Sequence, residues 1–403
     1  MRTMVFIGTS KSGSSREAIR AAERLGFYTV LFTRRKLNLE QRAEFSDVHE
    51  LISIDLDDVP SMREKIKQLQ KQGKIIEAIV SFVDGLVYTA AVLSEEFCHT
   101  DLSKEAILKM EDKIQTRNAL QKTPFNMNYA IYKQGSLSFF IEENELTFPL
   151  IVKAPHSAGS KDVLKVDRKS EFESCVNKLK QKYPGSPILV EEYIDGPQYL
   201  VETLVYQNKV NIVAIIEQEI SKEQRFIVTG YSLLAKVEEH LYESLSRAVI
   251  SIIRMLGMKN GACHLELKFH KNQWKLIEAN PRISGGAMNK MIEVAYGINL
   301  AEQIIKIAIG EAPSLQKTYK KFVFTQYITL ASSGELQLVT GRNRAWRYEG
   351  VDDVYIKPKR GTYLHPPLSM GHRYAYVMAS SSTKEEAKTI AKAAAKEIHF
   401  HLY

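Results

Sequence analysis

Cysteine is scarce in this chain, and this scarcity is the first indication of the protein's cellular compartment. Only three cysteines occur among 403 residues, at the widely separated positions 98, 175 and 263. An odd number at this spacing supports neither a disulfide framework nor a CxxC metal site, so reduced thiols of a cytosolic protein are the simplest interpretation. The sequence also has no signal peptide before its first strand-like run and no apolar run of membrane-spanning length. We therefore expect a cytoplasmic protein without a membrane partner.

Strong charge of one sign is also absent. The formal net charge of +8 is modest for this length and favours a mildly basic, solvated surface. The basic run Lys357–Arg360 is too short for a nucleic-acid-binding tail, so we expect no nucleic-acid partner. The chain has neither the GxGxxG dinucleotide fingerprint nor the GxxxxGK[ST] phosphate loop. The first glycine-containing loop, Gly8–Ser15, is therefore read as a plain turn between a strand and a helix.

The length and the apolar periodicity predict an α/β protein of two or three domains. Residues 3–8, 16–25 and 28–33 predict a strand, a helix and a strand, which together form a right-handed βαβ unit. One helix is expected over residues 101–120, with Lys113 inside it. Further strands and helices follow, including strands at 148–154, 162–166 and 187–194, a hairpin turn at 207–209, and helices at 171–182, 243–256, 289–297, 300–310 and 384–398.

The segment 263–282 carries the densest chemistry of the chain. It predicts two antiparallel strands, with Glu266 on the first and Glu278 and Asn280 on the second. Residues two apart point to the same face of a strand, so Leu276 is expected to share that face with Glu278 and Asn280. Two carboxylates and a carboxamide form an oxygen-only ligand set that suits Mg²⁺. With Arg282 beside them as a fixed cation, the segment predicts a metal–nucleotide active site.

Other polar residues follow predicted strands, and each has a plain alternative. Lys153 ends an apolar strand and faces a Ser/Gly loop whose backbone N–H groups can cover phosphates, although such lysines often face solvent. Lys113 taken alone is a surface helix residue. Glu191 or Glu192 can accept hydrogen bonds from an adenine amino group or a ribose hydroxyl, or can form a solvated strand end. Asp84 can contact a substrate, but a helix N-cap is favoured.

The order of these features resembles the ATP-grasp superfamily over roughly residues 1–310, and the run of residues 278–286 is its most specific part. Within that superfamily the chain looks like the bacterial L-amino-acid ligases, which join two unprotected amino acids into a dipeptide. The resemblance implies an α/β (α+β) fold in four parts. These are an N-terminal open parallel α/β domain (1–110), a lid subdomain (111–190), a core with the metal site (191–316) and a small C-terminal α+β subdomain (317–403).

The resemblance also implies a role for each matching residue. Lys113 and Lys153 correspond to lysines that hold ATP phosphates, and the loop His156–Lys161 corresponds to the lid over them. The other implied roles are lid contacts for Ser157, Gly159 and Ser160; adenine binding for Glu191, Glu192, Tyr193 and Ile194; a ribose contact for Gln198, where many members carry Glu; Mg²⁺ ligation, with Mn²⁺ as an alternative metal, for Glu266, Glu278 and Asn280; stabilisation of the anionic intermediate for Arg282; and receipt of the substrate carboxylate for Ser284, Gly285 and Gly286.

The activity implied is that of an ATP-dependent ligase forming a C–N (peptide) bond, of the acid–amino-acid type. Two L-amino acids would be joined through an aminoacyl phosphate, releasing ADP and phosphate. Two alternatives stay open. One is another carboxylate–amine ligase of the superfamily, acting on a purine precursor or building a peptide-like metabolite. The other is a nucleotide-binding module without catalysis, against which the presence of Arg282 argues. The expected partners are ATP and L-amino acids, and a homodimer stays open beside a monomer.

Overall fold

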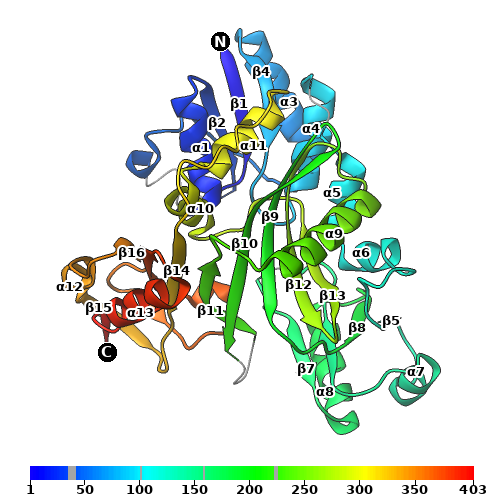
Figure 1. The fold of residues 1–403 in the computed structure, drawn as a ribbon. Coiled ribbons are helices and arrows are strands. Elements are labelled where there is room, and N and C mark those ends of the chain that lie inside the picture. Colours follow the sequence, from blue (N-terminus) through cyan, green and yellow to red (C-terminus); the bar gives the residue numbers. More distant parts are fainter. Residues whose placement is uncertain (35–41, 100–101, 158, 222–225) are drawn as a thin grey trace.

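The computed structural model describes residues 1–34, 42–99, 102–157, 159–221 and 226–403, and arranges them in four sheets flanked by helices (Figure 1). The first sheet is parallel with the strand order β3-β2-β1-β4, which confirms the predicted βαβ start. Its elements are β1 (Arg2–Ile7), α1 (Ser14–Arg24), β2 (Tyr28–Thr33), η1 (Arg42–Phe45), β3 (Glu50–Ser53), α3 (Val59–Lys71), β4 (Ile75–Val80) and α4 (Val87–Phe97).

The single helix predicted over residues 101–120 is wrong. The structure has two helices, α5 (Lys104–Glu111) and α6 (Lys113–Ala119), and Asp101 lies outside the described residues. Asp112 leaves the helical conformation between them, and its carboxylate accepts the N–H groups of Ile114 and Gln115. This N-cap satisfies donors that a new helix start would otherwise leave unpaired. Lys113 is consequently the first residue of α6 and not a mid-helix residue.

The segment expected to form the lid, called the lid below, contains a small antiparallel sheet with the strand order β5-β8-β6-β7. Helix α8 covers it and buries Phe172, Val176 and Leu179, which lie on one helix face. The elements of the lid are β5 (Tyr129–Tyr132), α7 (Leu137–Glu143), β6 (Leu150–Lys153), β7 (Val163–Val166), α8 (Lys169–Lys182) and β8 (Ile188–Glu192).

The largest sheet has eight strands in the order β13-β12-β9-β10-β11-β14-β18-β16. Strands from the C-terminal subdomain continue the core sheet across β11 and β14, so no break between sheets marks the expected boundary at residue 316. Gln207 and Asn208 form the predicted hairpin turn, both with positive φ. The elements are β9 (Gln198–Tyr206), β10 (Lys209–Ser221), β11 (Ile227–Leu233), α9 (Glu239–Leu256), β12 (Gly261–His270), β13 (Gln273–Asn280), α10 (Met288–Tyr296), α11 (Leu300–Ala308), β14 (Phe322–Ile328), β16 (Val351–Ile356) and β18 (Ala375–Ser381).

The C-terminal residues add a small antiparallel sheet with the order β17-β15-β19. Helix α13 packs on β14 and β18 through a stripe of buried alanines, whose small side chains allow a close approach to the sheet. The remaining elements are β15 (Gly334–Thr340), α12 (Arg342–Trp346), β17 (Tyr363–Leu364), η2 (Met370–His372), α13 (Lys384–Ala395) and β19 (His399–Leu402).

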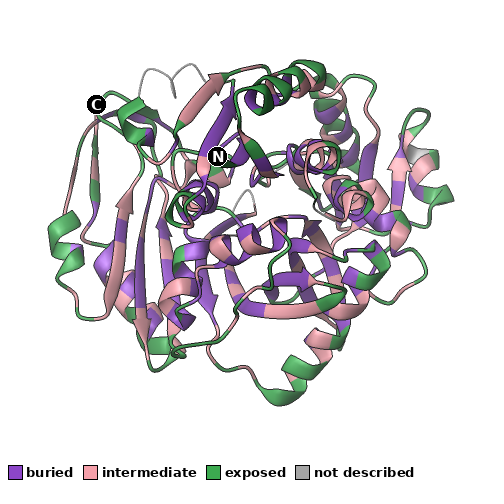
Figure 2. Cartoon of the chain, turned by 90° about the horizontal axis from the view of Figure 1, so that it is seen from above, coloured by how far each residue is buried: buried purple, intermediate pink, exposed green. Residues whose placement is uncertain are grey.

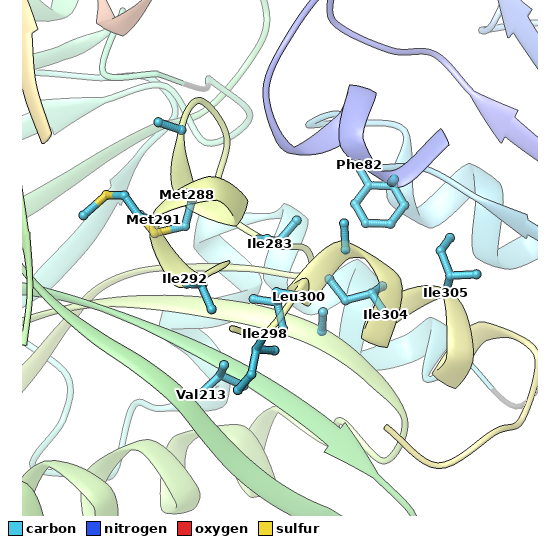
Figure 3. Close-up of a cluster of buried hydrophobic side chains, with 14 of the residues drawn as sticks. Phe82, Val213, Ile283, Met288, Met291, Ile292, Ile298, Leu300, Ile304 and Ile305 are labelled. Atoms are coloured by element: carbon cyan, nitrogen blue, oxygen red, sulfur yellow. The ribbon is translucent and has the colours of Figure 1, made fainter. Parts of the chain in front are cut away.

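One apolar cluster joins the N-terminal domain to the large sheet. Phe82 from the N-terminal domain, Val213 from β10, and residues of α10 and α11 contribute to it (Figure 3). Each fully buried large apolar side chain stabilises the fold by about 1.5–3 kcal/mol. Buried residues follow the strands, and exposed residues gather on the outer helices (Figure 2). Among the described residues no helix is both long and apolar enough to cross a membrane.

Candidate active site

Glu266 and Glu278 face each other directly on strands β12 and β13. The register shifts beside this pair, so that Ile277 is an extra residue between Glu278 and Leu276. A bulge of this kind re-aims the side chains that follow it. The expectation that Leu276 shares the face of Glu278 is therefore wrong: Leu276 is fully buried in the core, whereas Ile277 and Glu278 both line a cleft. Asn280, which pairs with His264 in the register, lines the cavity next to that cleft.

The carboxylate pair is buried, and its mutual repulsion is offset in part by nearby cations. Burial, together with the negative charge of Glu278, raises the pKa of Glu266 to about 7. Burial opposes ionisation of Glu278 as well, but Lys113, whose Nζ lies 3.0 Å from Oε1, lowers the pKa of Glu278. Gln198 Nε2 donates to Glu266 Oε2 at 3.0 Å. Two facing carboxylates beside a carboxamide form a hard-oxygen donor set that a divalent cation would satisfy.

Lys153 belongs to a buried network with Glu191 and Arg117. Glu191 accepts from Lys153 Nζ and from Arg117 Nε, each at 2.6 Å, and all three side chains are almost fully buried. Burial lowers the pKa of Lys153 to about 8, although Glu191 opposes that shift. Burial also disfavours ionised Glu191, yet Arg117 and Lys153 outweigh it and lower the pKa of Glu191. Arg117 Nη2 also donates to the carbonyl of the bulged Ile277 at 2.8 Å. This hydrogen bond connects the network to β13, the strand that carries Glu278.

The Ser/Gly loop after β6 is held at two points. Lys113 Nζ donates to the Ser157 carbonyl at 2.7 Å, so this lysine touches both the loop and Glu278. At the other point, Met370 N in the C-terminal subdomain donates to the Gly159 carbonyl at 3.2 Å. Ser160 has a positive φ and lines the cleft. Ala158 lies outside the described residues.

The cleft between the lid and the large sheet has an empty volume of about 710 Å³, which includes open solvent at its mouth. Its far end is made by the segment after β8, where Lys268 Nζ donates to the Ile194 carbonyl at 2.8 Å and Tyr193 stacks on Phe226. Both contacts hold Tyr193 and Ile194, which the family resemblance predicts to bind adenine. The predicted residues that line the cleft are Lys113, Lys153, Ser160, Glu191, Glu192, Tyr193, Ile194, Gln198, Glu266 and Glu278.

A second cavity opens beyond the carboxylate pair and shares Lys113 and Glu278 with the cleft. It is lined by Asp84, Ser157 and Asn280 among others. Asp84 is not the helix N-cap that we expected, since Leu86 takes that position at α4. The Asp84 carboxylate instead accepts from Nε of Arg282 at 2.6 Å.

His264 is a buried strand histidine that supports the backbone at Arg282. Its Nδ1 lies 2.8 Å from the carbonyl oxygen of Arg282. Burial and the nearby guanidinium of Arg282 lower the pKa of His264 to about 4, so the ring is neutral at pH 7 and Nδ1–H donates to that carbonyl. His264 therefore fixes the backbone from which the Arg282 side chain departs.

The loop Ser284–Gly286 contacts both the large sheet, through β9, and the N-terminal domain. Ser284 N donates to the buried Glu202 carboxylate at 2.8 Å, and Ser14 Oγ donates to the Ser284 carbonyl at 2.7 Å. Gly13, at φ +83°, passes so close that an added Cβ would lie 2.7 Å from the Gly286 carbonyl oxygen. The Gly8–Ser15 loop is therefore more than the plain turn predicted, because it supports the loop expected to receive the substrate carboxylate.

Arg373 is the site residue that sequence reasoning missed most completely. It follows η2 in the C-terminal subdomain, and its guanidinium lies 3.9 Å from the ring centre of Tyr327. Arg373 Nη2 is also 3.9 Å from where a Cβ on Gly286 would stand. A lone arginine between a loop and a strand carries no sequence signal. Its place depends on β18 pairing with β14 in the large sheet.

Three segments of the chain match known domain families. Residues 19–97 match the ATP-grasp N-terminal domain, residues 146–290 the ATP-grasp domain, and residues 326–403 the L-amino acid ligase C-terminal domain 2. The chain is an ATP-grasp protein. The suspected superfamily and the α/β fold with antiparallel ATP-grasp sheets are thus confirmed.

Solved structures share this fold over their whole length. L-amino acid ligase from Bacillus licheniformis superposes on the ATP-grasp chain with a TM-score of 0.86 at 20% identity, covering 100% of this chain and 99% of that one. Phosphoribosylglycinamide synthetase from Anaerococcus prevotii gives 0.76 at 18% identity, covering 100% of both. An uncharacterized protein of Sinorhizobium fredii is 26% identical over 262 residues, covering 64% of this chain and 54% of that protein. The chain therefore spans about half the length of that curated relative.

Proposed function

We propose that this ATP-grasp protein is an ATP-dependent carboxylate–amine ligase that joins two L-amino acids into a dipeptide. The observation that carries the proposal is the facing pair Glu266 and Glu278, with Lys113 bridging it to the lid loop and Arg282 just beyond. A binding module would need the lysines and the cleft. It would have no use for a guanidinium that is bound to Asp84, a residue lining the second cavity. The similarity to an L-amino acid ligase and the matching C-terminal domain support the choice of amino acids as substrates.

The residues present fit ATP and Mg²⁺. Glu266, Glu278 and Asn280 would hold the metal, because their oxygens suit a hard cation. Burial and the charge of Glu278 together raise the pKa of Glu266, and the metal would relieve that repulsion. When bound, Mg²⁺ supplies charge neutralisation to the triphosphate. Lys113 and Lys153 would contact the phosphates, and the lid loop would cover them. Glu192, Tyr193 and Ile194 would contact the adenine, and Gln198 the ribose.

The reaction follows from the poor reactivity of a free carboxylate, whose leaving group is oxide. The carboxylate of the first amino acid attacks the γ-phosphorus of ATP, giving an acyl phosphate and ADP. The lysines hold the charge of the transferring group. The amine of the second amino acid then attacks the acyl carbon, phosphate leaves, and the amine loses a proton. Arg282 stabilises the tetrahedral oxyanion. The lid loop, held by Lys113 and by the C-terminal subdomain, keeps water from the acyl phosphate.

A phosphate-release assay over pairs of free L-amino acids tests this proposal. We expect ADP and phosphate in equal amounts with the dipeptide, and only when amino acids are present. Cleavage of ATP with another carboxylic acid or a purine precursor, but not with amino acids, would favour the second candidate. The similarity to phosphoribosylglycinamide synthetase keeps that candidate open. Nucleotide binding without cleavage under any condition would reduce the chain to a binding module.

A further inference from the structure

Arg282, which follows β13, and Arg373, which precedes β18, have different surroundings. Arg282 already has a counter-ion, because its Nε donates to the Asp84 carboxylate. Arg373 has no carboxylate at ion-pair distance among the residues that the structure describes. Its Nε and Nη1 donate to the carbonyls of Met370 and Val228, each at 3.3 Å. The groups in contact with the Arg373 guanidinium are therefore neutral, while the Glu266 carboxylate acts on its charge from beyond ion-pair distance.

The tyrosines beside Arg373 and the more distant Glu266 carboxylate favour its positive charge. The guanidinium lies over the ring of Tyr327 at 3.9 Å and near that of Tyr231 at 5.6 Å, and both tyrosines are buried. A cation over an aromatic face is stabilised by about 0.5–2 kcal/mol, which helps to hold the charge without a direct ion pair. A guanidinium without a direct ion pair can bind an anion, and the planar arrangement of its N–H donors matches a carboxylate.

The location of Arg373 indicates which anion it would bind. Met370 and Val228, whose carbonyls hold Arg373, line the nucleotide cleft, and Gly286 is exposed on the other side. In the ligation proposed above, the carboxylate of the first amino acid is consumed. The carboxylate of the second remains an anion throughout and needs a permanent cation.

We propose that Arg373 binds the free carboxylate of the amino acid that supplies the amine, so that the C-terminal subdomain completes the acceptor subsite. This inference rests on the proposed function. Gly286 contributes by having no side chain, because a Cβ there would come within 3.1 Å of the Tyr327 hydroxyl and within 3.9 Å of the Arg373 guanidinium. Recognition of the acceptor through its carboxylate would also select amino acids over simple amines.

The test compares an acceptor amino acid with its amide, which keeps the amine and loses the negative charge. For the wild-type enzyme we expect kcat/KM to favour the acid at least tenfold. In Arg373→Gln that preference should fall at least tenfold, mainly through KM for the acid, and Arg373→Lys should restore part of it. Arg360→Gln, the same substitution at an exposed arginine of the same subdomain, is the matched control and should keep the wild-type preference.

Hydroxylamine as the acceptor separates failure of this inference from failure of the proposed function. It traps an activated donor as a hydroxamate without needing an acceptor site. If the wild-type enzyme forms no hydroxamate from any amino acid, the proposed function fails. If hydroxamate forms but the acid-to-amide preference is the same in Arg373→Gln and wild type, this inference is overturned. Equal use of acid and amide by the wild-type enzyme overturns it as well, even if Arg373→Gln does not fold.

Discussion

Arg282 and Asp84 are joined by a hydrogen bond from Nε to Oδ1 of 2.6 Å, although 198 positions separate them in the chain. Arg282 follows the last core strand, β13, and Asp84 follows β4 of the N-terminal domain. The contact holds the guanidinium of Arg282 against Asp84, which lines the second cavity. The N-terminal domain thus orients the cation that the proposed mechanism needs at the acyl carbon.

Replacement of Arg282 by Ala should reduce kcat/KM for ligation by roughly 10²–10³-fold, because a donor to the oxyanion is lost. The affinity for ATP should change little, since Arg282 does not line the nucleotide cleft. Phosphate release and calorimetric nucleotide binding measure the two effects. Asp84→Asn is the companion variant, and it should lose less activity because the guanidinium remains. Turnover of Arg282→Ala at the wild-type rate would contradict the assigned role.

Replacement of Gly13 by Ala tests the support of the substrate loop. The new Cβ would lie 2.7 Å from the Gly286 carbonyl oxygen, so the loop must move, and KM for the amino acids should rise severalfold or more. Gly26→Ala is the matched control. Gly26 has nearly the same φ, +82° against +83°, but nothing within 4 Å of an added Cβ. Both variants place a side chain at positive φ, so equal kinetics in the two would show that the Gly13–Gly286 approach has no role in catalysis.

Glu191→Gln should leave Lys153 and Arg117 buried without their shared counter-ion, which costs about 3–5 kcal/mol of folding stability. The charge of Lys153 should also be affected. Its pKa of about 8 in the wild type is held up by Glu191 against burial, so in the variant the lysine should lose its proton at lower pH. Affinity for an ATP analogue should then fall with rising pH earlier than in the wild type.

Denaturant unfolding and pH-dependent binding check these two effects, with the exposed Glu173→Gln on the lid as the control. A Glu191→Gln variant with the stability of Glu173→Gln and an unshifted binding profile would contradict the assigned network.

Glu202 gives a prediction for stability against pH. Burial raises the pKa of Glu202 to about 8, well above the value of an unfolded glutamate. The protonated form is thus favoured by folding. Its contribution is fully present below about pH 4.5 and is lost as the pH rises through about 8. Glu202→Gln, which mimics the protonated acid, should flatten the fall in thermal midpoint between about pH 4.5 and 8. An identical fall in both proteins would contradict a buried neutral Glu202.

Local sequence patterns were sufficient to predict the strands that carry Glu266 and Glu278, because alternation and turn residues are properties of short segments. They failed where a single residue changes the geometry. Asp112 splits one expected helix through its capping carboxylate, and the bulge at Ile277 moves Leu276 to the core. Neither event changes the apolar periodicity that the prediction used.

Residues brought in by distant segments were beyond sequence reasoning for a different reason. Arg117 reaches Glu191 and the Ile277 carbonyl from α6, and Arg373 reaches the Gly286 loop from beside β18. These contacts depend on how strands from different parts of the chain pair, which no local pattern encodes. The same holds for Asp84, whose partner Arg282 belongs to another domain.

The most direct test of the account follows oxygen from the donor carboxylate. One amino acid is labelled with ¹⁸O in its carboxylate, ligation is run with ATP and an unlabelled partner, and the released phosphate is analysed by mass spectrometry. Because attack on the γ-phosphorus makes a carboxylate oxygen part of the phosphate, the account predicts one ¹⁸O in each phosphate formed. Phosphate without the label, or release of pyrophosphate in place of phosphate, would contradict it.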